Sequence, residues 1–98
     1  MKVILRPSTR SGKKWMVEVD HGCIVHFGAE GYEDFTMHKD AQRRKNYIAR
    51  HRSNQNWNDF CTAGAWSRWL LWEWPSMSQA IRGMKRKHGI TIVRKRKN

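Results

Sequence analysis

The feature that most constrains this sequence is a tryptophan-rich stretch in its second half. Residues 62–75, TAGAWSRWLLWEWP, hold four of the six tryptophans in a chain of 98 residues. Each large aromatic side chain can bury about 150–250 Å². Such a cluster serves a core helix, a platform for stacking bases, or an anchor for another protein. A chain of this size forms a single modest core. Because only 39% of its residues are hydrophobic, the tryptophan rings must supply much of that core.

Helical signals frame this stretch. Thr62 is a candidate N-cap, and Pro75 is a stop signal. Trp66, Trp69 and Leu70 fall on one helical face, and the neighbouring residues make most of the circumference apolar. A helix of this kind is normally buried on more than one side. We therefore predict a buried helix with Trp66 and Trp69 in the core.

Two other tryptophans flank this helix beside polar residues. Trp57 and Trp74 are therefore candidates for an aromatic interface with a partner. Base-stacking platforms contribute about 1–3 kcal/mol per base, but they are exposed and usually lie on sheets. The tryptophan helix fits that role less well than it fits the core.

The first 27 residues predict a three-stranded antiparallel meander. The segments KVILRPS, KWMVEVD and CIVHFG are rich in strand-forming residues, and Gly12 and His21-Gly22 mark the turns. In the second segment Trp15, Val17 and Val19 share one face. Residues 28–35, GAEGYEDF, read as a loop.

Two further helices and a final strand follow from local signals. Asp40 is a plausible N-cap for a helix that ends before residues 53–56. Ser76 or Ser78 caps a second helix, and Gly89 suits its C-terminal end. The segment ITIV, residues 90–93, predicts a short strand returning to the sheet. The fold class is therefore α+β, with one domain over residues 1–93 and a basic tail over residues 94–98.

Positive charge increases toward the C-terminus. The net charge is +12, and basic and acidic residues cancel over residues 1–40. Residues 41–81 contain six Lys/Arg and two Asp/Glu, and residues 82–98 contain eight Lys/Arg and no Asp or Glu. This asymmetry predicts a polyanionic partner: nucleic acid, an acidic protein surface or anionic lipid. The candidate binding residues are Arg43, Lys45, Arg50, Arg52, Lys85, Arg86, Lys87, Arg94, Lys95, Arg96 and Lys97.

The sequence offers little for catalysis. It has no phosphate-binding loop, dinucleotide fingerprint or nucleophile elbow, and HKD at residues 38–40 lacks the spacing of the phospholipase motif. Asp34, His38 and Asp40 could form a base–carboxylate arrangement, but helix capping explains them better. We predict no enzyme activity, no catalytic residues, no cofactor and no small-molecule substrate.

A metal site is also not expected. Zinc sites normally use closely spaced ligand pairs, and the possible ligands here are dispersed along the chain: Cys23, His26, His38, His51 and Cys61. We interpret His51 as an interior histidine beside Tyr47. We expect both cysteines to be reduced and buried, in a protein that matures in a cytoplasm. No apolar run is long enough to span a membrane, and the N-terminus does not read as a secretory signal.

A family resemblance emerges from three segments in order. These are DFTMHKDAQRRKNYIARH, then NWND, then TAGAWSRWLLW followed by a proline. Together they resemble a small family of uncharacterised proteins encoded by nucleocytoplasmic large DNA viruses, over about residues 31–81. The chain departs from that pattern at Ala65, where a bulkier Phe is usual, and in WEW before Pro75.

The resemblance implies a viral origin and a structural role. Our first hypothesis is a non-enzymatic minor capsid or virion protein, present in host cytoplasm during assembly, that docks on acidic surfaces of neighbouring capsid proteins. The alternative is a sequence-nonspecific nucleic-acid-binding protein that condenses or tethers viral DNA.

Overall fold

Three consecutive strands form the predicted antiparallel meander. The computed structural model, which describes residues 1–20 and 22–95, places them at Lys2–Pro7 (β1), Lys13–Val19 (β2) and Cys23–Ala29 (β3). Val17 of β2 pairs with Leu5 on one side and Val25 on the other. This register brings inward-facing side chains of all three strands onto one face of the sheet.

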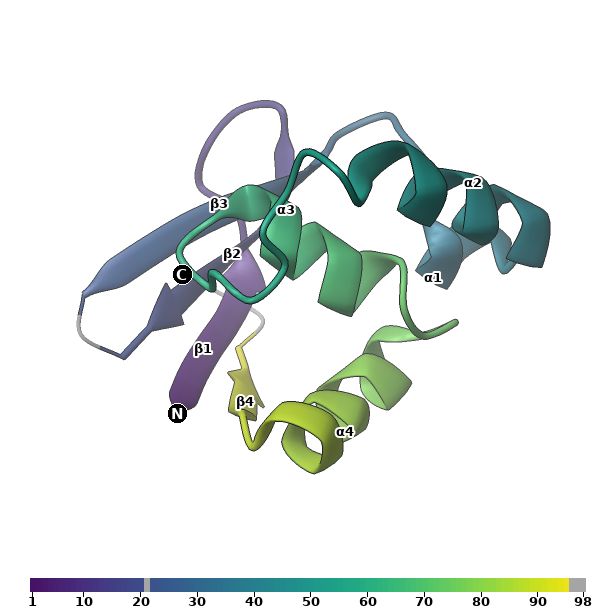
Figure 1. Cartoon of the computed structure of the whole chain (residues 1–98). Helices are drawn as coiled ribbons and strands as arrows, with labels where there is room; N and C mark the ends of the chain where they lie inside the picture. Colours follow the sequence, from purple (N-terminus) through teal and green to yellow (C-terminus); the bar gives the residue numbers. More distant parts are fainter. Residues whose placement is uncertain (21, 96–98) are drawn as a thin grey trace.

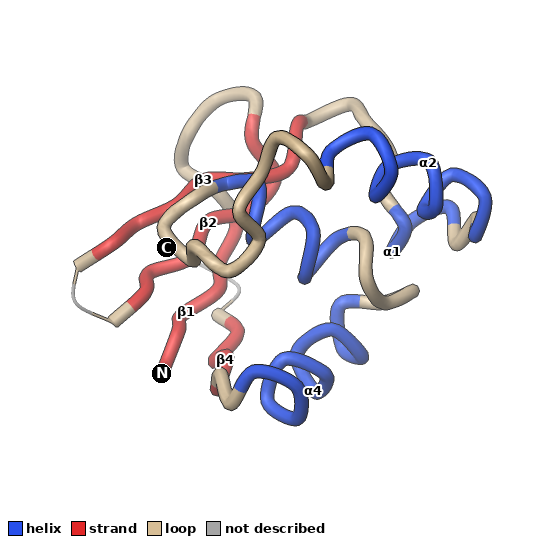
Figure 2. Tube along the Cα trace, viewed as in Figure 1, coloured by secondary structure: helices blue, strands red, loops and turns tan. Residues whose placement is uncertain are grey.

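A fourth strand returns from the C-terminus. β4 (Thr91–Arg94) lies parallel to β1, which gives the strand order β3-β2-β1-β4 (Figures 1 and 2). The Lys95 amide extends the pairing by donating to the Leu5 carbonyl at 2.8 Å. Arg94 and Lys95, expected in the tail, therefore continue the sheet, whereas residues 96–98 lie outside the described part of the chain.

Helical segments fill the connection between β3 and β4 and cover one face of the sheet (Figure 2). They are α1 (Phe35–His38), α2 (Ala41–His51), α3 (Ala63–Trp66), a π-helical turn η1 (Ser67–Leu71) and α4 (Met77–His88). The α+β prediction, with an N-terminal meander, helices and a short final strand, is confirmed. The short helix α1 begins at Phe35, the last residue of the expected loop.

The helices begin at the capping residues that the sequence indicated. The side chains of Asp40, Thr62 and Ser76 each accept a hydrogen bond from a backbone amide in the first turn of α2, α3 and α4. Gly89 ends α4 with φ of 67°, the left-handed conformation that glycine adopts without strain.

The core lies between the sheet and the tryptophan helix. Trp66 is fully buried, and Trp69 is 8% exposed, as predicted. Each indole N–H finds a backbone acceptor, the carbonyl of Phe60 for Trp66 and that of Trp57 for Trp69. The polar edges of both rings are therefore satisfied inside the fold.

The tryptophan helix ends earlier than Pro75. The last residue of η1 is Leu71, and Trp72 leaves the helical conformation. The Arg44 side chain donates from Nε to the Trp72 carbonyl at 2.8 Å, which satisfies a carbonyl at the helix end. The helix therefore ends where Arg44 contacts it, three residues before the proline.

The prediction of reduced cysteines is wrong. Cys23 at the start of β3 and Cys61 before α3 form a disulfide, with 5.9 Å between their Cα atoms. Cys61 is exposed and Cys23 is half-buried. The two residues are 38 positions apart, and they meet because the segment before α3 packs back against the start of β3.

Within the described residues, no helix has the length and apolar character needed to cross a membrane.

Candidate polyanion-binding surface

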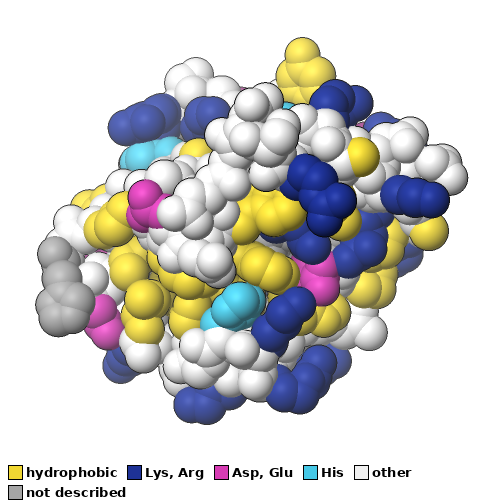
Figure 3. All heavy atoms as spheres, in the orientation of Figure 1, with side chains coloured by type: hydrophobic (Ala, Val, Ile, Leu, Met, Phe, Trp, Pro, Cys, Tyr) yellow, Lys and Arg dark blue, Asp and Glu magenta, His cyan; other side chains and the backbone are white. Residues whose placement is uncertain are grey.

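The predicted basic residues lie on three elements. Arg43, Lys45 and Arg50 are exposed on α2, and Arg52 follows directly after it. The last turn of α4 carries Lys85, Arg86 and Lys87, and the end of the sheet carries Arg94 and Lys95. Figure 3 shows Lys and Arg side chains around much of the visible rim, with hydrophobic side chains between them. Arg96 and Lys97 lie outside the described residues.

The fold uses its few carboxylates internally. Seven of the eight acidic side chains have partners within the described structure: Glu18, Asp20, Glu33, Asp34, Asp40, Asp59 and Glu73. Asp34 is 3% exposed, caps α1 and lies 2.7 Å from Lys14 Nζ. Asp40 and Asp59 accept from backbone amides. Asp34, Asp40 and Asp59 therefore stabilise local structure, whereas the exposed Glu33 pairs with Arg43 on the surface.

Many cations consequently remain unneutralised. Among residues 1–20 and 22–95, nine Lys and Arg side chains form no ion pair with a carboxylate, no cation–π contact and no hydrogen bond: Lys2, Arg10, Lys13, Lys45, Arg50, Arg52, Arg82, Arg86 and Lys95. Of the predicted candidates, Arg43 pairs with Glu33 at 3.2 Å. Arg94 lies over the Trp15 ring at 5.4 Å. The unpaired set is the part of the surface best suited to an external polyanion.

A charge cluster around Glu73 was not foreseen from the sequence. The carboxylate binds the guanidinium groups of Arg44 and Arg68, and Lys87 Nζ lies 3.7 Å away. Burial raises the pKa of Glu73, but hydrogen bonds and charges from Arg68 and Arg44 outweigh it and hold the pKa below its ordinary value. Three cations around one carboxylate leave this part of the fold positively charged.

Arg68 has a structural position within that cluster. It is 8% exposed, and its guanidinium lies 5.0 Å from the Trp57 ring centre and 4.7 Å from that of Trp69. Lys87 Nζ also lies over Trp69, at 4.8 Å. The aromatic faces and the Glu73 carboxylate together stabilise the buried charge.

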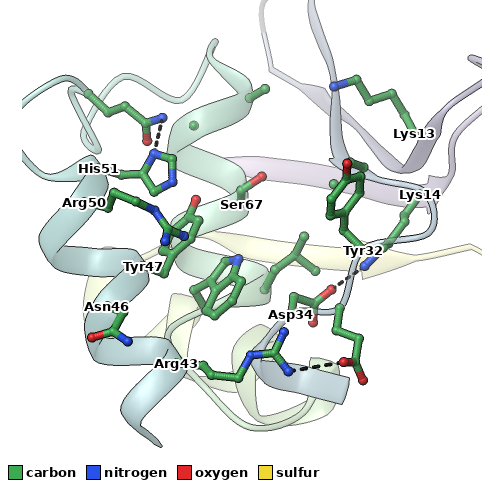
Figure 4. A pocket seen from close by; sticks show the side chains of 18 residues that line it. Lys13, Lys14, Tyr32, Asp34, Arg43, Asn46, Tyr47, Arg50, His51 and Ser67 are labelled. Carbon is green, nitrogen blue, oxygen red and sulfur yellow. Dashed lines mark hydrogen bonds and ion pairs between the residues drawn. The ribbon is translucent and has the colours of Figure 1, made fainter. Parts of the chain in front are cut away.

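A groove of about 770 Å³ lies between α2 and the end of the β2–β3 hairpin. Figure 4 shows Arg43, Asn46, Tyr47, Arg50 and His51 along one wall. The opposite wall carries charged side chains and a tyrosine, while α3 and η1 form the floor: Lys13, Lys14, Tyr32, Glu33, Asp34, Ala63, Gly64, Ser67, Leu71 and Trp72. The volume falls in the range of ligand pockets.

Stacked rings join α1, α2 and the end of η1. Tyr47 is stacked on Trp72, with 4.2 Å between the ring centres and 3° between the ring planes, and the tilted His51 ring lies 4.3 Å from Tyr47. His38 contacts Trp72 at 5.3 Å. Burial raises the pKa of Tyr47, against the opposing charges of Arg68 and Arg50. The rings at the floor are therefore engaged with one another.

The two aromatic interface candidates are held within the fold. Trp57 is half-buried, donates from Nε1 to Gln55 Oε1 at 2.9 Å and lies under Arg68. Trp74 is half-buried and packs so closely on Gly83 that a Cβ there would overlap its ring. Neither ring is a free anchor for a partner in this conformation.

The residues considered for chemistry are dispersed or have structural roles. His38 Nδ1 accepts from the Asp40 amide at 2.9 Å, and Asp40 caps α2. His51 contacts Tyr47 as predicted, although it is half-buried rather than interior. In the described part of the chain no three His, Cys, Asp or Glu side chains gather as a metal site would require. Cys61 is held in the disulfide, so in this state it is not a free thiol.

Comparison with known families identifies a match. Residues 3–51, half of the chain, match the family of unknown function DUF5754. The chain belongs to this family. Neither the curated proteins nor the solved structures contain a match. The matched segment covers the meander, α1 and α2, and therefore both walls of the groove, whereas the floor comes from the residues that follow it.

Proposed function

We propose that the protein is a non-enzymatic structural component of the particle of a large DNA virus, a minor capsid or virion protein that docks on acidic surfaces of neighbouring proteins. The observation that carries this proposal is the unneutralised charge. Seven of eight acidic side chains have partners within the fold, while twelve Lys and Arg side chains lack a carboxylate partner among the described residues. The resemblance to viral proteins supplies the setting.

Two further features support docking. A disulfide joins Cys23 to Cys61, and disulfides persist in oxidising settings that include virion surfaces. Tyr47 of the wall and Trp72 of the floor stack on each other in the groove, so they are a poor platform for nucleic-acid bases, which stack on free ring faces.

Location in the particle tests this proposal. Purified virions are opened, the shell is separated from the genome, and the protein is followed with and without nuclease. A docking protein stays with the shell after nuclease treatment. If nuclease frees it from a genome fraction, the proposal is wrong. A truncation control must begin after Lys95, because Arg94 pairs with Leu5 in the sheet.

Nucleic-acid binding is the second candidate, and one observation on α4 favours it. Arg82 and Arg86 are exposed one helical turn apart, and residues 74–98 contain no carboxylate. Like charges at this spacing destabilise a helix by about 0.2–0.5 kcal/mol, a cost that bound phosphates remove. This candidate predicts duplex DNA binding whose log affinity falls with log salt by about 0.9 per phosphate contact, with Arg82→Glu/Arg86→Glu reducing that slope.

A further inference from the structure

Two unpaired cations lie on opposite walls of the groove. Arg50 extends from α2, and Lys13 stands at the start of β2 (Figure 4). Neither has a carboxylate partner among residues 1–20 and 22–95. We propose that this groove is the docking site for an extended acidic peptide segment of a partner protein, whose carboxylates bind between Lys13 and Arg50. This assignment rests on the proposed docking function and identifies where and what the protein binds.

The floor of the groove suits a peptide backbone. Ala63 and Ser67 present small side chains there, so a chain can approach α3 and η1 closely at these two positions, whereas the Gln55 side chain covers Gly64. The half-buried Trp72 adds an apolar surface for a hydrophobic side chain of the segment. A volume of about 770 Å³ holds a few residues of a partner and not a folded domain.

The charge along the groove is uneven, which favours a peptide over nucleic acid. Glu33 pairs with Arg43, and Asp34 with Lys14, in the lower part of Figure 4. A phosphate backbone carries a charge at every nucleotide and would pass close to both carboxylates. A peptide can place its acidic side chains beside Lys13 and Arg50 alone, with neutral residues near the two ion pairs.

The rim also has a residue typical of protein interfaces. Tyr32 is 72% exposed on the wall opposite α2. Its ring offers apolar area and its hydroxyl offers hydrogen bonding, a combination that is enriched where proteins bind each other. A segment in the groove would cover this ring.

Matched charge reversals test the site. The probes are fluorescein-labelled deca-glutamate and a ten-nucleotide oligothymidylate, measured by anisotropy at about 0.15 M salt. Lys13→Glu/Arg50→Glu alters the groove, and Arg82→Glu/Arg86→Glu changes the net charge equally on α4. We expect the groove variant to bind deca-glutamate at least about ten-fold more weakly than the wild type, and the α4 variant about two-fold more weakly. Charges next to a bound carboxylate affect its binding more strongly than distant charges, which salt screens.

A steric variant separates position from charge. Ser67 lies between the walls (Figure 4), so Ser67→Phe fills the groove at constant charge and should also weaken deca-glutamate binding by about ten-fold. Each variant is checked for a cooperative unfolding transition, and Lys13→Gln/Arg50→Gln replaces the reversal if that variant does not fold.

The outcomes distinguish the site from the function. The groove and α4 variants could lose affinity for deca-glutamate equally while Ser67→Phe keeps the wild-type affinity. That result would place acidic-segment binding elsewhere on the surface, and it would refute the groove as the site without refuting the docking function. Tighter binding of the oligothymidylate than of deca-glutamate by the wild type, weakened by the α4 variant, would overturn the docking function together with the groove.

Discussion

Replacing Gly83 by alanine tests how firmly Trp74 is held against α4. At an exposed helix interior this change normally stabilises a protein by about 1 kcal/mol, because glycine is the poorer helix former. Gly83 is buried, however, and an added Cβ would lie 2.8 Å from Trp74 Cη2 and still closer to two other atoms of that ring. A large planar ring cannot yield as the end of a flexible side chain does.

The two effects oppose each other, and the steric effect is the larger. Overpacking of a closely packed site costs about 1–3 kcal/mol, and contacts this short with a rigid ring place the cost at about 2–3 kcal/mol. Gly83→Ala should therefore lower the free energy of unfolding by about 1–2 kcal/mol after the helix-propensity gain of about 1 kcal/mol. In a Trp74→Ala background the clash is absent, and the same change should stabilise by about 1 kcal/mol. The predicted coupling between the two positions is therefore about 2–3 kcal/mol.

Urea unfolding followed by circular dichroism measures all four proteins of this cycle. The sign of the Gly83→Ala effect should reverse between the two backgrounds. A stabilising effect of Gly83→Ala in the wild-type background would refute the reasoning. It would show that Trp74 moves freely away from α4 and would restore this residue as a candidate interface anchor.

Other perturbations test the core, the disulfide and the titrating groups. Trp69→Ala should cost about 3–5 kcal/mol in chemical unfolding, and a loss below about 1 kcal/mol would contradict its place in the core. Reducing the Cys23–Cys61 disulfide should lower the free energy of unfolding by about 2–4 kcal/mol, measured with and without reductant. Burial and the Lys87 charge lower the pKa of His88, and the Glu73 charge opposes them. Because the unfolded chain then binds a proton at this histidine more readily than the folded protein does, the free energy of unfolding should fall as pH drops below about 6.5. His88→Gln should reduce that fall. The depressed pKa of Glu73 adds stability that is present above about pH 4.5 and is lost on further acidification, a loss that Glu73→Gln should remove.

The elements of the fold were predictable because their signals are local. A capping side chain such as Asp40 or Thr62 bonds an amide two or three residues away, so the sequence window contains the whole interaction. The same holds for Gly89 at the end of α4. The alternation of Trp15, Val17 and Val19 likewise specifies an inward face before any partner strand is known.

The disulfide and the candidate site depend on distant parts of the chain. Cys23 and Cys61 meet through packing, and their spacing alone does not separate a disulfide from two thiols. The groove requires a β-hairpin, α2 and η1 to meet. The sequence did contain one signal for the cluster of Glu73 with Arg44 and Arg68. Glu73 is the acidic residue of an apolar segment in a strongly basic part of the chain, and a carboxylate in such a segment needs cationic partners.

The segments DFTMHKDAQRRKNYIARH and TAGAWSRWLLW contain several residues that stabilise the fold. Asp34 caps α1, and Tyr47 stacks on Trp72 and contacts His51. These contacts give such residue types at such spacings a structural role. Arg50 belongs to the same segments but has no carboxylate partner among the described residues, and it faces a groove whose opposite wall carries another unpaired cation. The charge of Arg50 is not used in an ion pair within the described part of the chain. We therefore expect the partner of Arg50 to be a group outside the chain.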